Sequence, residues 1–389
     1  MGNFFQRFRR LALVCATALT APVATLAQDE DAASTADADV FETGLGEPIG
    51  RVSGRLAYNS ERGPIVGLGI ETTRFLGRDQ HLQFAVEADE NDTRYRLLTR
   101  SDDLFGTQPR LSLLIESRQQ SANDNFAFDV SANSARAGLG WTLTDDLDAT
   151  SYLLVSRDRI YDVAPNASAL IEADAGTSDR VAVGGELDYV LRDPESGQSV
   201  RLDLGLELGK RDDADEGYLK ITGGLAYTQR LLGGDVILNQ TLRAGAIDSR
   251  GGTSSIGDRF ILGSGSIRGF ELAGFGPRDL AVGREPALGG NRFVAARTTG
   301  WFPNALPDTD RIAPGVFFDA GSLWGLDDTG GGPGGASPVD DDFSLRGSAG
   351  VTVRIATGIG RLDISLAHVR LQEDYDETRT VQVSFSQQF

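Results

Sequence analysis

Apolar and polar residues alternate along most of the chain from about residue 50 onward, without the period of a helix. The segment 199–210 shows this clearly, with Val200, Leu202, Leu204, Leu206 and Leu208 on one side and Arg201, Asp203, Gly205, Glu207 and Gly209 on the other. The last segment repeats the pattern, with Val381, Val383, Phe385 and Phe389 opposite Gln382, Ser384, Ser386 and Gln388. A period of two with one apolar face predicts half-buried β-strands.

Water-soluble β-sandwiches also alternate, but three further features favour a barrel in a membrane. Charged residues and glycines occupy the middle of the non-apolar faces, as a hydrated lumen requires. The segments run about ten to fourteen residues, which suits a tilted membrane strand better than a soluble one. Short and long connections also alternate: tight turns at 77–79, 145–146, 233–234 and 358–360 separate longer stretches near 120–133, 161–178, 248–289 and 325–343.

The predicted fold class is therefore all-β, a transmembrane antiparallel β-barrel of about 16 strands. The expected strands are 50–58, 64–76, 80–89, 93–101, 109–119, 134–144, 147–160, 179–192, 199–210, 217–232, 235–247, 290–302, 311–324, 344–357, 360–371 and 379–389. The stretch 123–132 is assigned to a loop. An even number of strands places the connection 248–289 outside the cell and Phe389 at the periplasmic edge.

Residues 1–27 are typical of a secretory signal peptide, which predicts export through the periplasm to a Gram-negative outer membrane. Arg7, Arg9 and Arg10 precede an apolar core of about ten residues, too short to span a bilayer. Residues 28–48 are acidic, small and nearly free of large apolar side chains, which predicts a disordered linker. The expected domains are a signal peptide (1–27), this linker (28–48) and a barrel (49–389).

Composition argues against several classes of function. The single cysteine, Cys15, lies inside the expected signal peptide, so the exported chain has no thiol nucleophile or sulfur ligand. A net charge of −19 argues against a nucleic-acid partner, which would need a basic face. His81 and His368 are far apart without a neighbouring serine–acid constellation, so we expect no enzyme and no cofactor. The acidic stretch 327–342 matches no calcium loop, so no metal site is expected.

The segment 263–279, within the longest connection between predicted strands, combines glycines with isolated arginines. Glycine lets a backbone fold tightly and approach another surface. An arginine between such residues offers a planar fork to a carboxylate or carbonyl. A long loop of this kind in a compact fold is usually functional.

Two stretches resemble the BamA/TamA family of outer-membrane assembly barrels, the bacterial surface antigen-like barrels. Residues 266–270 (Ser-Ile-Arg-Gly-Phe), 274–279 (Gly-Phe-Gly-Pro-Arg-Asp) and 288–291 (Leu-Gly-Gly-Asn) are similar to the sixth outer loop of that family. Residues 317–324 (Phe-Phe-Asp-Ala-Gly-Ser-Leu-Trp) are similar to its thirteenth strand. The resemblance is specific from about 258 to the end and fainter over 50–160.

The resemblance implies that the sixth loop folds into the lumen, where Arg268 meets Asp319 on the wall beside Gly321. A bidentate arginine–carboxylate pair shielded from water can hold a flexible loop in one place. The residues that the family motif points to in the loop are Ile267, Arg268, Gly269, Phe270, Gly276, Pro277, Arg278 and Asp279.

The chain departs from the family pattern in three places. The family carries periplasmic POTRA domains ahead of its barrel, whereas only the acidic linker follows the expected signal peptide, so we expect a barrel without POTRA domains. Thr298 or Thr299 stands where the twelfth strand often has an acidic residue, which leaves Arg268 one carboxylate partner. Ser386 stands where the last strand of BamA has a kinking glycine, so that strand is expected to be less plastic.

In the family, the seam between the first and last strands is the working part. Here that seam joins Gly50, Ser53 and Gly54 to Val383, Phe385, Ser386 and Phe389. Glycine and polar residues weaken the pairing, and a weakly paired edge can template a client strand. A disulfide between positions 54 and 386 would test lateral opening.

The resemblance implies a protein that assists insertion, assembly or translocation of proteins at the outer membrane, without catalytic residues. The alternative is a passive or ligand-specific outer-membrane channel that kept the fold and lost assembly activity. The partners implied are outer-membrane lipids and lipopolysaccharide, client β-barrels or secreted polypeptides, and a periplasmic accessory protein.

Overall fold

A computed structural model describes residues 50–388, except 61, 73–79, 102–108, 124–125, 194–195, 251, 284, 307–310 and 359. The expected signal peptide (1–27), the expected linker (28–48) and Phe389 lie outside the described residues. So do the expected turn at 77–79 and the middle of the turn at 358–360.

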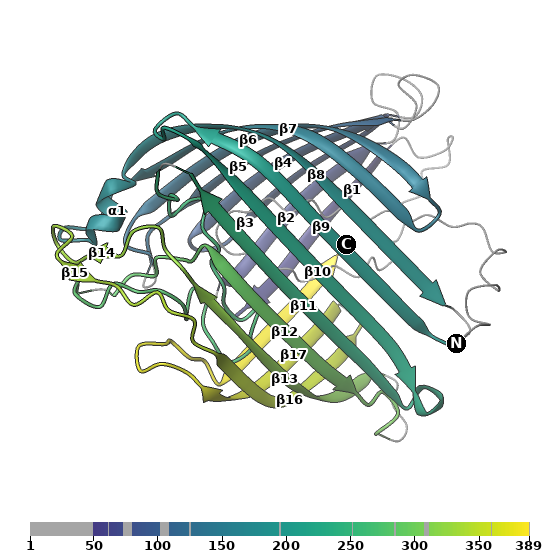
Figure 1. Cartoon of the computed structure of the whole chain (residues 1–389). Helices are drawn as coiled ribbons and strands as arrows, with labels where there is room; N and C mark the ends of the chain where they lie inside the picture. Colours follow the sequence, from purple (N-terminus) through teal and green to yellow (C-terminus); the bar gives the residue numbers. More distant parts are fainter. Residues whose placement is uncertain are drawn as a thin grey trace, which may run out of the picture.

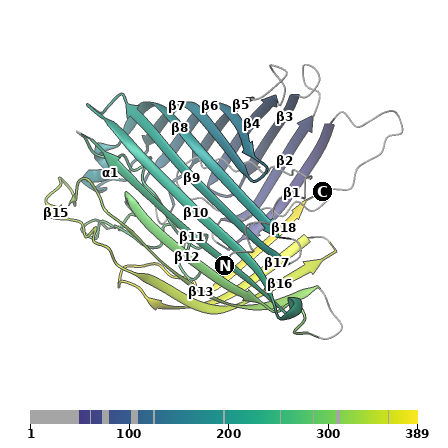
Figure 2. The same cartoon turned by 45° about the vertical axis from the view of Figure 1, so that its right-hand side comes forward.

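Within the described residues, sixteen antiparallel strands close into one barrel, which confirms the predicted fold class (Figure 1). Neighbours around the wall follow the order of the chain, and β1 pairs with β18 to close it (Figure 2). The strands are β1 (Gly50–Asn59), β2 (Gly63–Thr72), β3 (Gln80–Ala88), β4 (Asp92–Ser101), β5 (Arg110–Gln120), β6 (Asp129–Thr144), β7 (Leu147–Tyr161), β8 (Gly176–Asp193), β9 (Gln198–Arg211), β10 (Gly217–Leu231), β11 (Val236–Ser249), β12 (Arg292–Trp301), β13 (Ile312–Trp324), β16 (Arg346–Thr357), β17 (Gly360–Leu371) and β18 (Val381–Gln388).

Short elements also lie in the described parts of the connections. They are the helix α1 (Ala169–Ala173) between β7 and β8, a 3₁₀ turn (Leu232–Gly234) between β10 and β11, and a hairpin of β14 (Gly330–Gly331) and β15 (Ser337–Pro338). No helix in the described ranges has both the length and the apolar character needed to cross a membrane.

The predicted strand boundaries agree with the structure to within a few residues, apart from one error. The sequence predicts a loop over 123–132, but β6 already begins at Asp129. The physical reason is that Val130 is only 4% exposed and packs in an apolar cluster with Phe126 and Phe128. The long stretch 161–178 likewise contains α1 and the first residues of β8.

Along the strands, apolar side chains face outward and polar side chains face inward, the reverse of a soluble protein. On β8, Val181 and Val183 face outward and are 55% and 53% exposed, whereas Arg180 and Glu186 face inward and are 5% and 8% exposed. On β9, the outward leucines at 202, 204, 206 and 208 are likewise exposed. Apolar side chains that cover the outside of a closed wall need a lipid environment, so the pattern is that of a transmembrane barrel.

The two ends of the barrel differ. We call the end with the short connections 145–146 and 232–235 the turn end, and the end with the connections 121–128, 162–175, 250–291, 325–345 and 372–380 the loop end. The strands β6 to β11 have 14 to 18 residues, whereas β1 to β4 have 9 or 10 and β18 has 8. Among the described residues, the wall strands around the closure between β1 and β18 are therefore the shortest.

Apolar side chains from separate connections pack together at the loop end. This loop-end cluster comprises Phe126, Phe128, Val130, Ile160, Leu170, Ile171, Ile256, Ile261, Ala273, Ala287, Leu288 and Val339. The helix α1 contributes Leu170 and Ile171, and the hydroxyl of Ser168 caps it by accepting a hydrogen bond from the Leu170 N–H at 3.3 Å. The cluster is the apolar core that joins the loops above the barrel wall.

Candidate functional site

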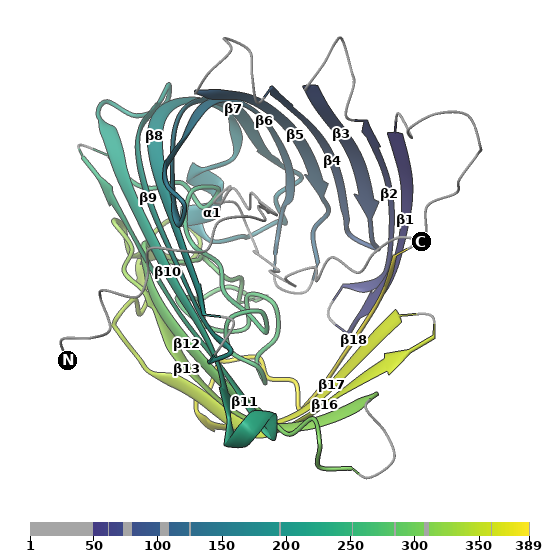
Figure 3. The same cartoon turned by 90° about the vertical axis from the view of Figure 1, so that its right-hand side faces the viewer.

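The connection between β11 and β12, residues 250–291, is called L6 here. Viewed along the barrel, its described part lies inside the wall, alongside β10 to β12 (Figure 3). Ile256, Ile267, Phe270 and Leu288 are fully buried in it, and Phe275 is 2% exposed. L6 is therefore a packed insertion in the lumen.

Arg268 binds the wall through Asp319 of β13. Its Nε and Nη2 donate to the two carboxylate oxygens at 2.7 Å each, and its backbone N–H donates to Oδ2 at 3.0 Å. Nη2 also donates to Thr299 Oγ1 of β12 at 2.9 Å, and the guanidinium carbon lies 3.8 Å from the centre of the Phe317 ring. The structure thus brings together the loop arginine and the wall aspartate that the sequence paired.

Thr299 stands in the place for which the sequence left Thr298 and Thr299 open. It supplies a neutral acceptor, so Asp319 is the carboxylate that pairs with Arg268. Asp319 is fully buried, and Arg297 of β12 lies 3.6 Å from its Oδ2. A buried carboxylate needs such partners, because desolvation without them costs several kcal/mol. The donors around Asp319 therefore define where L6 must sit.

Glycines make this close approach possible. Gly269 and Gly276 have φ values of +95° and +109°, a backbone conformation that residues other than glycine rarely adopt. A Cβ atom at Gly276 would lie 2.6 Å from Leu323 Cδ2, inside the van der Waals limit. On the wall, a Cβ atom at Gly321 would lie 3.1 Å from Ile267 Cδ1. A larger residue at Gly276 would therefore push L6 off the wall, whereas one at Gly321 would first meet the backbone of β12.

Apolar residues of L6 pack beside the Arg268 anchor. Ile267, Phe270 and Phe275 form a lumen cluster with Leu262, Phe293 and Leu323. The rings of Phe270 and Phe275 meet edge to face, 5.0 Å between centroids. This cluster removes water from around the ion pair, which strengthens the pair's hydrogen bonds.

The second half of the motif fastens L6 to other loops. Arg278 donates to the backbone oxygen of Ala273 at 2.6 Å and to the Glu377 carboxylate at 3.2 Å. Asp279 is 1% exposed and accepts the Gly332 N–H at 2.6 Å, which ties L6 to the connection between β13 and β16. Pro277 contributes its carbonyl, which accepts the Leu288 N–H at 3.0 Å.

A second anchor, which the sequence reasoning missed, holds the first half of L6 to β8, β9 and β10, a part of the wall a few strands away from the first anchor. The Asp258 carboxylate accepts from Arg180 of β8 at 2.6 Å and from Arg211 of β9 at 2.8 Å, and Lys220 of β10 donates to its backbone oxygen at 3.1 Å. Burial alone would raise the pKa of Asp258, but Arg180 and Arg211 outweigh it and hold that pKa below its ordinary value. The sequence does hold one sign of this anchor: Arg180, Arg211 and Lys220 all occupy strand positions that face the lumen.

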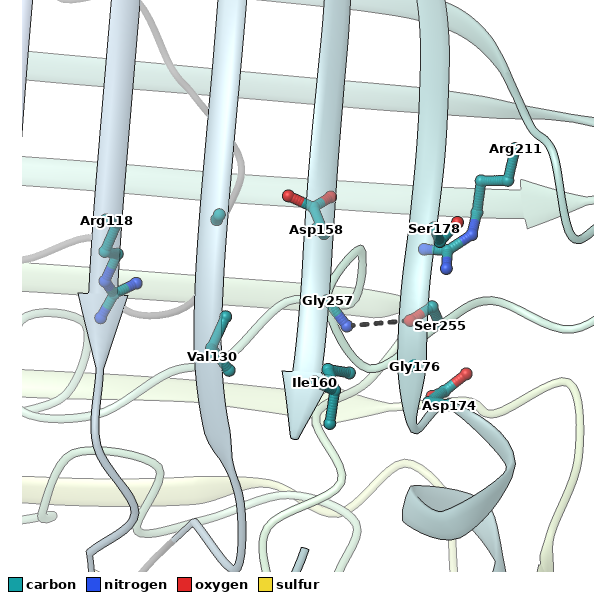
Figure 4. A pocket seen from close by; sticks show the side chains of 11 residues that line it. Arg118, Val130, Asp158, Ile160, Asp174, Gly176, Ser178, Arg211, Ser255 and Gly257 are labelled. Carbon is teal, nitrogen blue, oxygen red and sulfur yellow. Dashed lines mark hydrogen bonds between the residues drawn. The ribbon is translucent and has the colours of Figure 1, made fainter. Parts of the chain in front are cut away.

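A small recess lies beside this second anchor (Figure 4). Wall residues Arg118, Asp158, Ser178 and Arg211 line it together with Asp174, and Ser255 and Gly257 of L6 lie across it. Arg118 pairs with Asp92 at 2.8 Å, and Arg211 pairs with Asp258. The carboxylate of Asp174 accepts the Ile256 N–H at 2.7 Å. Val130 and Ile160 also line it, so the recess is a boundary between L6 and the wall with both polar and apolar sides.

The seam between β1 and β18 has a short register. It runs from Arg55 opposite Gln388 to Asn59 opposite Ser384, five residue pairs, against ten between β1 and β2 and six between β17 and β18. Gly50, Ser53 and Gly54 therefore pair with β2 and have no partner on β18 among the described residues. Ala57 lies opposite Ser386 and Tyr58 opposite Phe385, while Val383 accepts the Ser60 N–H at 3.1 Å.

This register corrects the crosslink that the sequence suggested. Position 54 is not opposite 386, because the pairing is shifted by three residues and places Ala57 there. Register depends on how the barrel closes, and the pattern of either strand alone does not carry that information. A disulfide across the seam therefore belongs at 57 and 386.

Comparison with known proteins agrees with this architecture. The family model of the Omp85 superfamily domain matches residues 74–389. The outer membrane protein assembly factor BamA of Neorickettsia risticii (strain Illinois) is 24% identical over 343 residues, which cover 86% of this chain and 44% of that protein. The chain thus spans less than half the length of this curated relative.

Two solved structures share the fold. BamA from Haemophilus ducreyi lacking POTRA domains 1–3 matches with a TM-score of 0.73 at 19% identity, over 88% of this chain and 71% of that one. CdiB from Acinetobacter baumannii matches with a TM-score of 0.54 at 14% identity, over 87% and 59%. Because the family model covers most of the chain and the closed wall carries its apolar side chains outside, the chain belongs to the Omp85 superfamily and is a transmembrane β-barrel of the outer membrane.

Proposed function

We propose that this barrel assists the insertion, assembly or translocation of proteins at a Gram-negative outer membrane, and that its working part is the seam between β1 and β18. Its clients would be β-barrel or secreted polypeptides. The relatives named as an assembly factor and as CdiB support this class of activity. No catalytic side chain takes part in the proposed mechanism.

The observation that carries the proposal is the five-pair register of the seam. The side of β1 that faces β18 leaves the backbone groups of Gly50 to Gly54 without a strand partner in the described part of the chain. An extended client segment could add to this edge through main-chain hydrogen bonds, which is how β-augmentation works. Opening the rest of the seam breaks fewer hydrogen bonds than opening the β1–β2 pairing would, because that pairing is twice as long.

A disulfide across the seam tests the proposal. The variant Ala57→Cys/Ser386→Cys would lock β1 to β18, whereas the matched control Ala57→Cys/Ile65→Cys ties β1 to β2, at another register pair, and leaves the seam free. Both are made with Cys15→Ser, and client folding is followed by the heat-dependent gel shift of a barrel client in vesicles. We expect the seam disulfide to stop the folding of the client barrel, and we expect a reductant to restore it. Unchanged client folding with the seam locked would refute the proposed mechanism.

The second candidate is a passive or ligand-specific channel. The packing of L6 on two parts of the wall favours the assembly function, since a diffusion pore needs an open lumen. Deleting residues 263–279 and measuring both conductance and client assembly separates the two. If L6 only plugs a channel, the deletion enlarges the pore and leaves assembly normal.

We propose further that the loop end faces the outside of the cell and the turn end the periplasm. Outer-membrane lipids and lipopolysaccharide would then surround the apolar wall, and a periplasmic accessory protein would reach the turn end. Protease accessibility of the loops in intact cells tests this orientation, because only the loop end should be cleaved from outside.

A further inference from the structure

The tip of L6 forms a short backbone ladder with the segment that leads into β18. The Glu271 N–H donates to the Glu377 carbonyl at 3.0 Å, and the Glu377 N–H donates to the Gly274 carbonyl at 2.8 Å. Phe270 and Thr378 form an antiparallel bridge, and the Arg379 N–H donates to the Gly269 carbonyl at 2.8 Å. The same turn of L6 that carries Arg268 is therefore bonded to the start of one seam strand.

The segment before β18 is also fixed to the wall. Arg346 of β16 is 1% exposed and donates to the Asp376 carboxylate at 3.0 and 3.2 Å and to the Tyr375 hydroxyl at 3.1 Å. Further along, Gln382 of β18 donates from its amide to the Phe270 carbonyl at 3.3 Å. The loop end of β18 is thus braced by β16 and by L6, independently of β1.

The side chain of Arg379 joins the segment before β18 to the end of β1. Arg379 donates from Nη1 to the carbonyl of Ser60, the residue that follows β1, and from Nη2 and Nε to the Glu271 carboxylate at 3.2 and 3.3 Å. Arg379 and Glu271 are about one third exposed, so their ion pair alone is weak. Its geometric effect is larger, because Glu271 aims the guanidinium across the seam.

We propose that the Arg379 side chain closes the loop end of the seam and that the position of L6 controls it; we call this side chain the latch. The inference rests on the proposed role of the seam. Beyond the five strand pairs, the Ser60–Val383 backbone bond and the Arg379–Ser60 bond join the two sides of the seam at its loop end. Withdrawing the guanidinium removes a charge-assisted bond from the loop end. A movement of L6 that displaces Glu271 would do the same, so the position of L6 sets how easily β1 departs.

The test measures the width of the seam directly. Spin labels at Leu68→Cys on β2 and Leu366→Cys on β17 face outward on either side of the seam, in a chain that also carries Cys15→Ser. Double electron–electron resonance in proteoliposomes then reports the distance across four strands. Leu68 lies opposite Gly54 and Leu366 opposite Val381, so the two positions also differ in height along the wall, and their backbones are about 30 Å apart when the seam is closed. We expect Arg379→Ala to enlarge the long-distance population by roughly tenfold, the effect of losing one charge-assisted hydrogen bond.

Two further variants make the test specific. Glu271→Gln keeps the size of the side chain and should shift the distances in the same direction but less, and it should add nothing in the Arg379→Ala background. Arg201→Ala is the matched control, because Arg201 is similarly exposed at 35% and pairs with Asp188 at 3.2 Å, away from the seam. It should leave the distances unchanged.

A distance distribution of Arg379→Ala identical to that of the parent, in protein that keeps its heat-dependent gel shift, overturns the latch. An equal effect of Arg201→Ala overturns it too. The readout does not use client assembly, so its failure is distinguishable from failure of the proposed function: a seam disulfide that leaves client folding intact would refute the function while the distances still report the latch.

Discussion

At the scale of residues, the position of L6 depends on a few buried charges whose partners come from different strands. Asp319 is fully buried and receives the Arg268 backbone N–H and both arms of its guanidinium. Desolvating such a pair costs free energy, so the pair fixes the position of L6 more than it stabilises the fold. The charge of each partner is tolerable only while the other is present.

Removing one partner should therefore be worse than removing both. We expect Asp319→Ala to lower the free energy of unfolding by about 3–5 kcal/mol, because it leaves the buried Arg268 uncompensated. The double variant Arg268→Leu/Asp319→Leu should lose less than that single change. Urea titration of the folded fraction in vesicles measures both. The matched control is Asp363→Ala, which removes a lumen carboxylate that pairs with Arg354 at 2.9 Å but is 24% exposed, and which should cost about 0–1 kcal/mol. Equal losses for Asp319→Ala and Asp363→Ala would contradict this account.

At the scale of elements, L6 is held at two places on the wall that the sequence reveals unequally. The Arg268–Asp319 pair could be predicted because each residue lies in a recognisable motif. Asp258 carries no such motif, and its partners Arg180, Arg211 and Lys220 come from three strands whose mutual register the sequence does not give. The seam register and the latch escaped prediction for the same reason, since both depend on closure between residues that are more than 300 positions apart.

The Asp258 anchor should make the attachment of L6 depend on pH only in strong acid. The folded-state pKa of Asp258 is lowered, so its contribution to stability is present above the ordinary value of about 3.9 and is lost as the pH falls through the lower folded value. A nitroxide at Leu280→Cys, an exposed position of L6, should therefore stay immobilised from pH 7 to below pH 4 and become mobile only in stronger acid.

The control for this titration is Asp258→Asn, which keeps the size of the side chain and removes the charge. The acid step in nitroxide mobility should disappear in that variant. Burial raises the pKa of Asp174 despite the nearby Arg259, so this residue titrates on the opposite side of the ordinary value and does not imitate the step. Mobilisation centred above pH 4 in the parent would contradict the assignment to Asp258.

At the scale of the whole molecule, the wall could be predicted almost strand for strand, because a period of two is written locally in each segment. The prediction of a loop over 123–132 was wrong at the start of β6, where Val130 stands among polar residues. The burial of Val130 depends on Phe126 and Phe128 of the preceding connection. The period alone does not say which face meets lipid, but the charged residues and glycines of the non-apolar faces predicted a hydrated lumen there. The exposed fractions agree, with Leu204 at 47% on the outside and Arg180 at 5% inside.

The lipid-facing assignment predicts a strongly one-sided response to charge. Leu204→Arg places a guanidinium near the middle of β9 on the outer face and should cost about 2–4 kcal/mol of folding free energy in vesicles. Asp203→Asn, the neighbouring lumen-facing change on the same strand, should stay within about 0.5 kcal/mol. Urea titration in vesicles compares the two, and equal costs would mean that the outer face is not in the bilayer.

The loop-end cluster has a consequence for biogenesis. Its members span positions 126 to 339, and no single connection can bury its own phenylalanines, leucines or isoleucines. In the proposed orientation, each of these segments therefore crosses to the outer side of the membrane before it can pack, and it packs only when the others have arrived. Contacts between such distant positions form slowly. We therefore expect the loop-end cluster to pack last, after the strands of the barrel wall have paired.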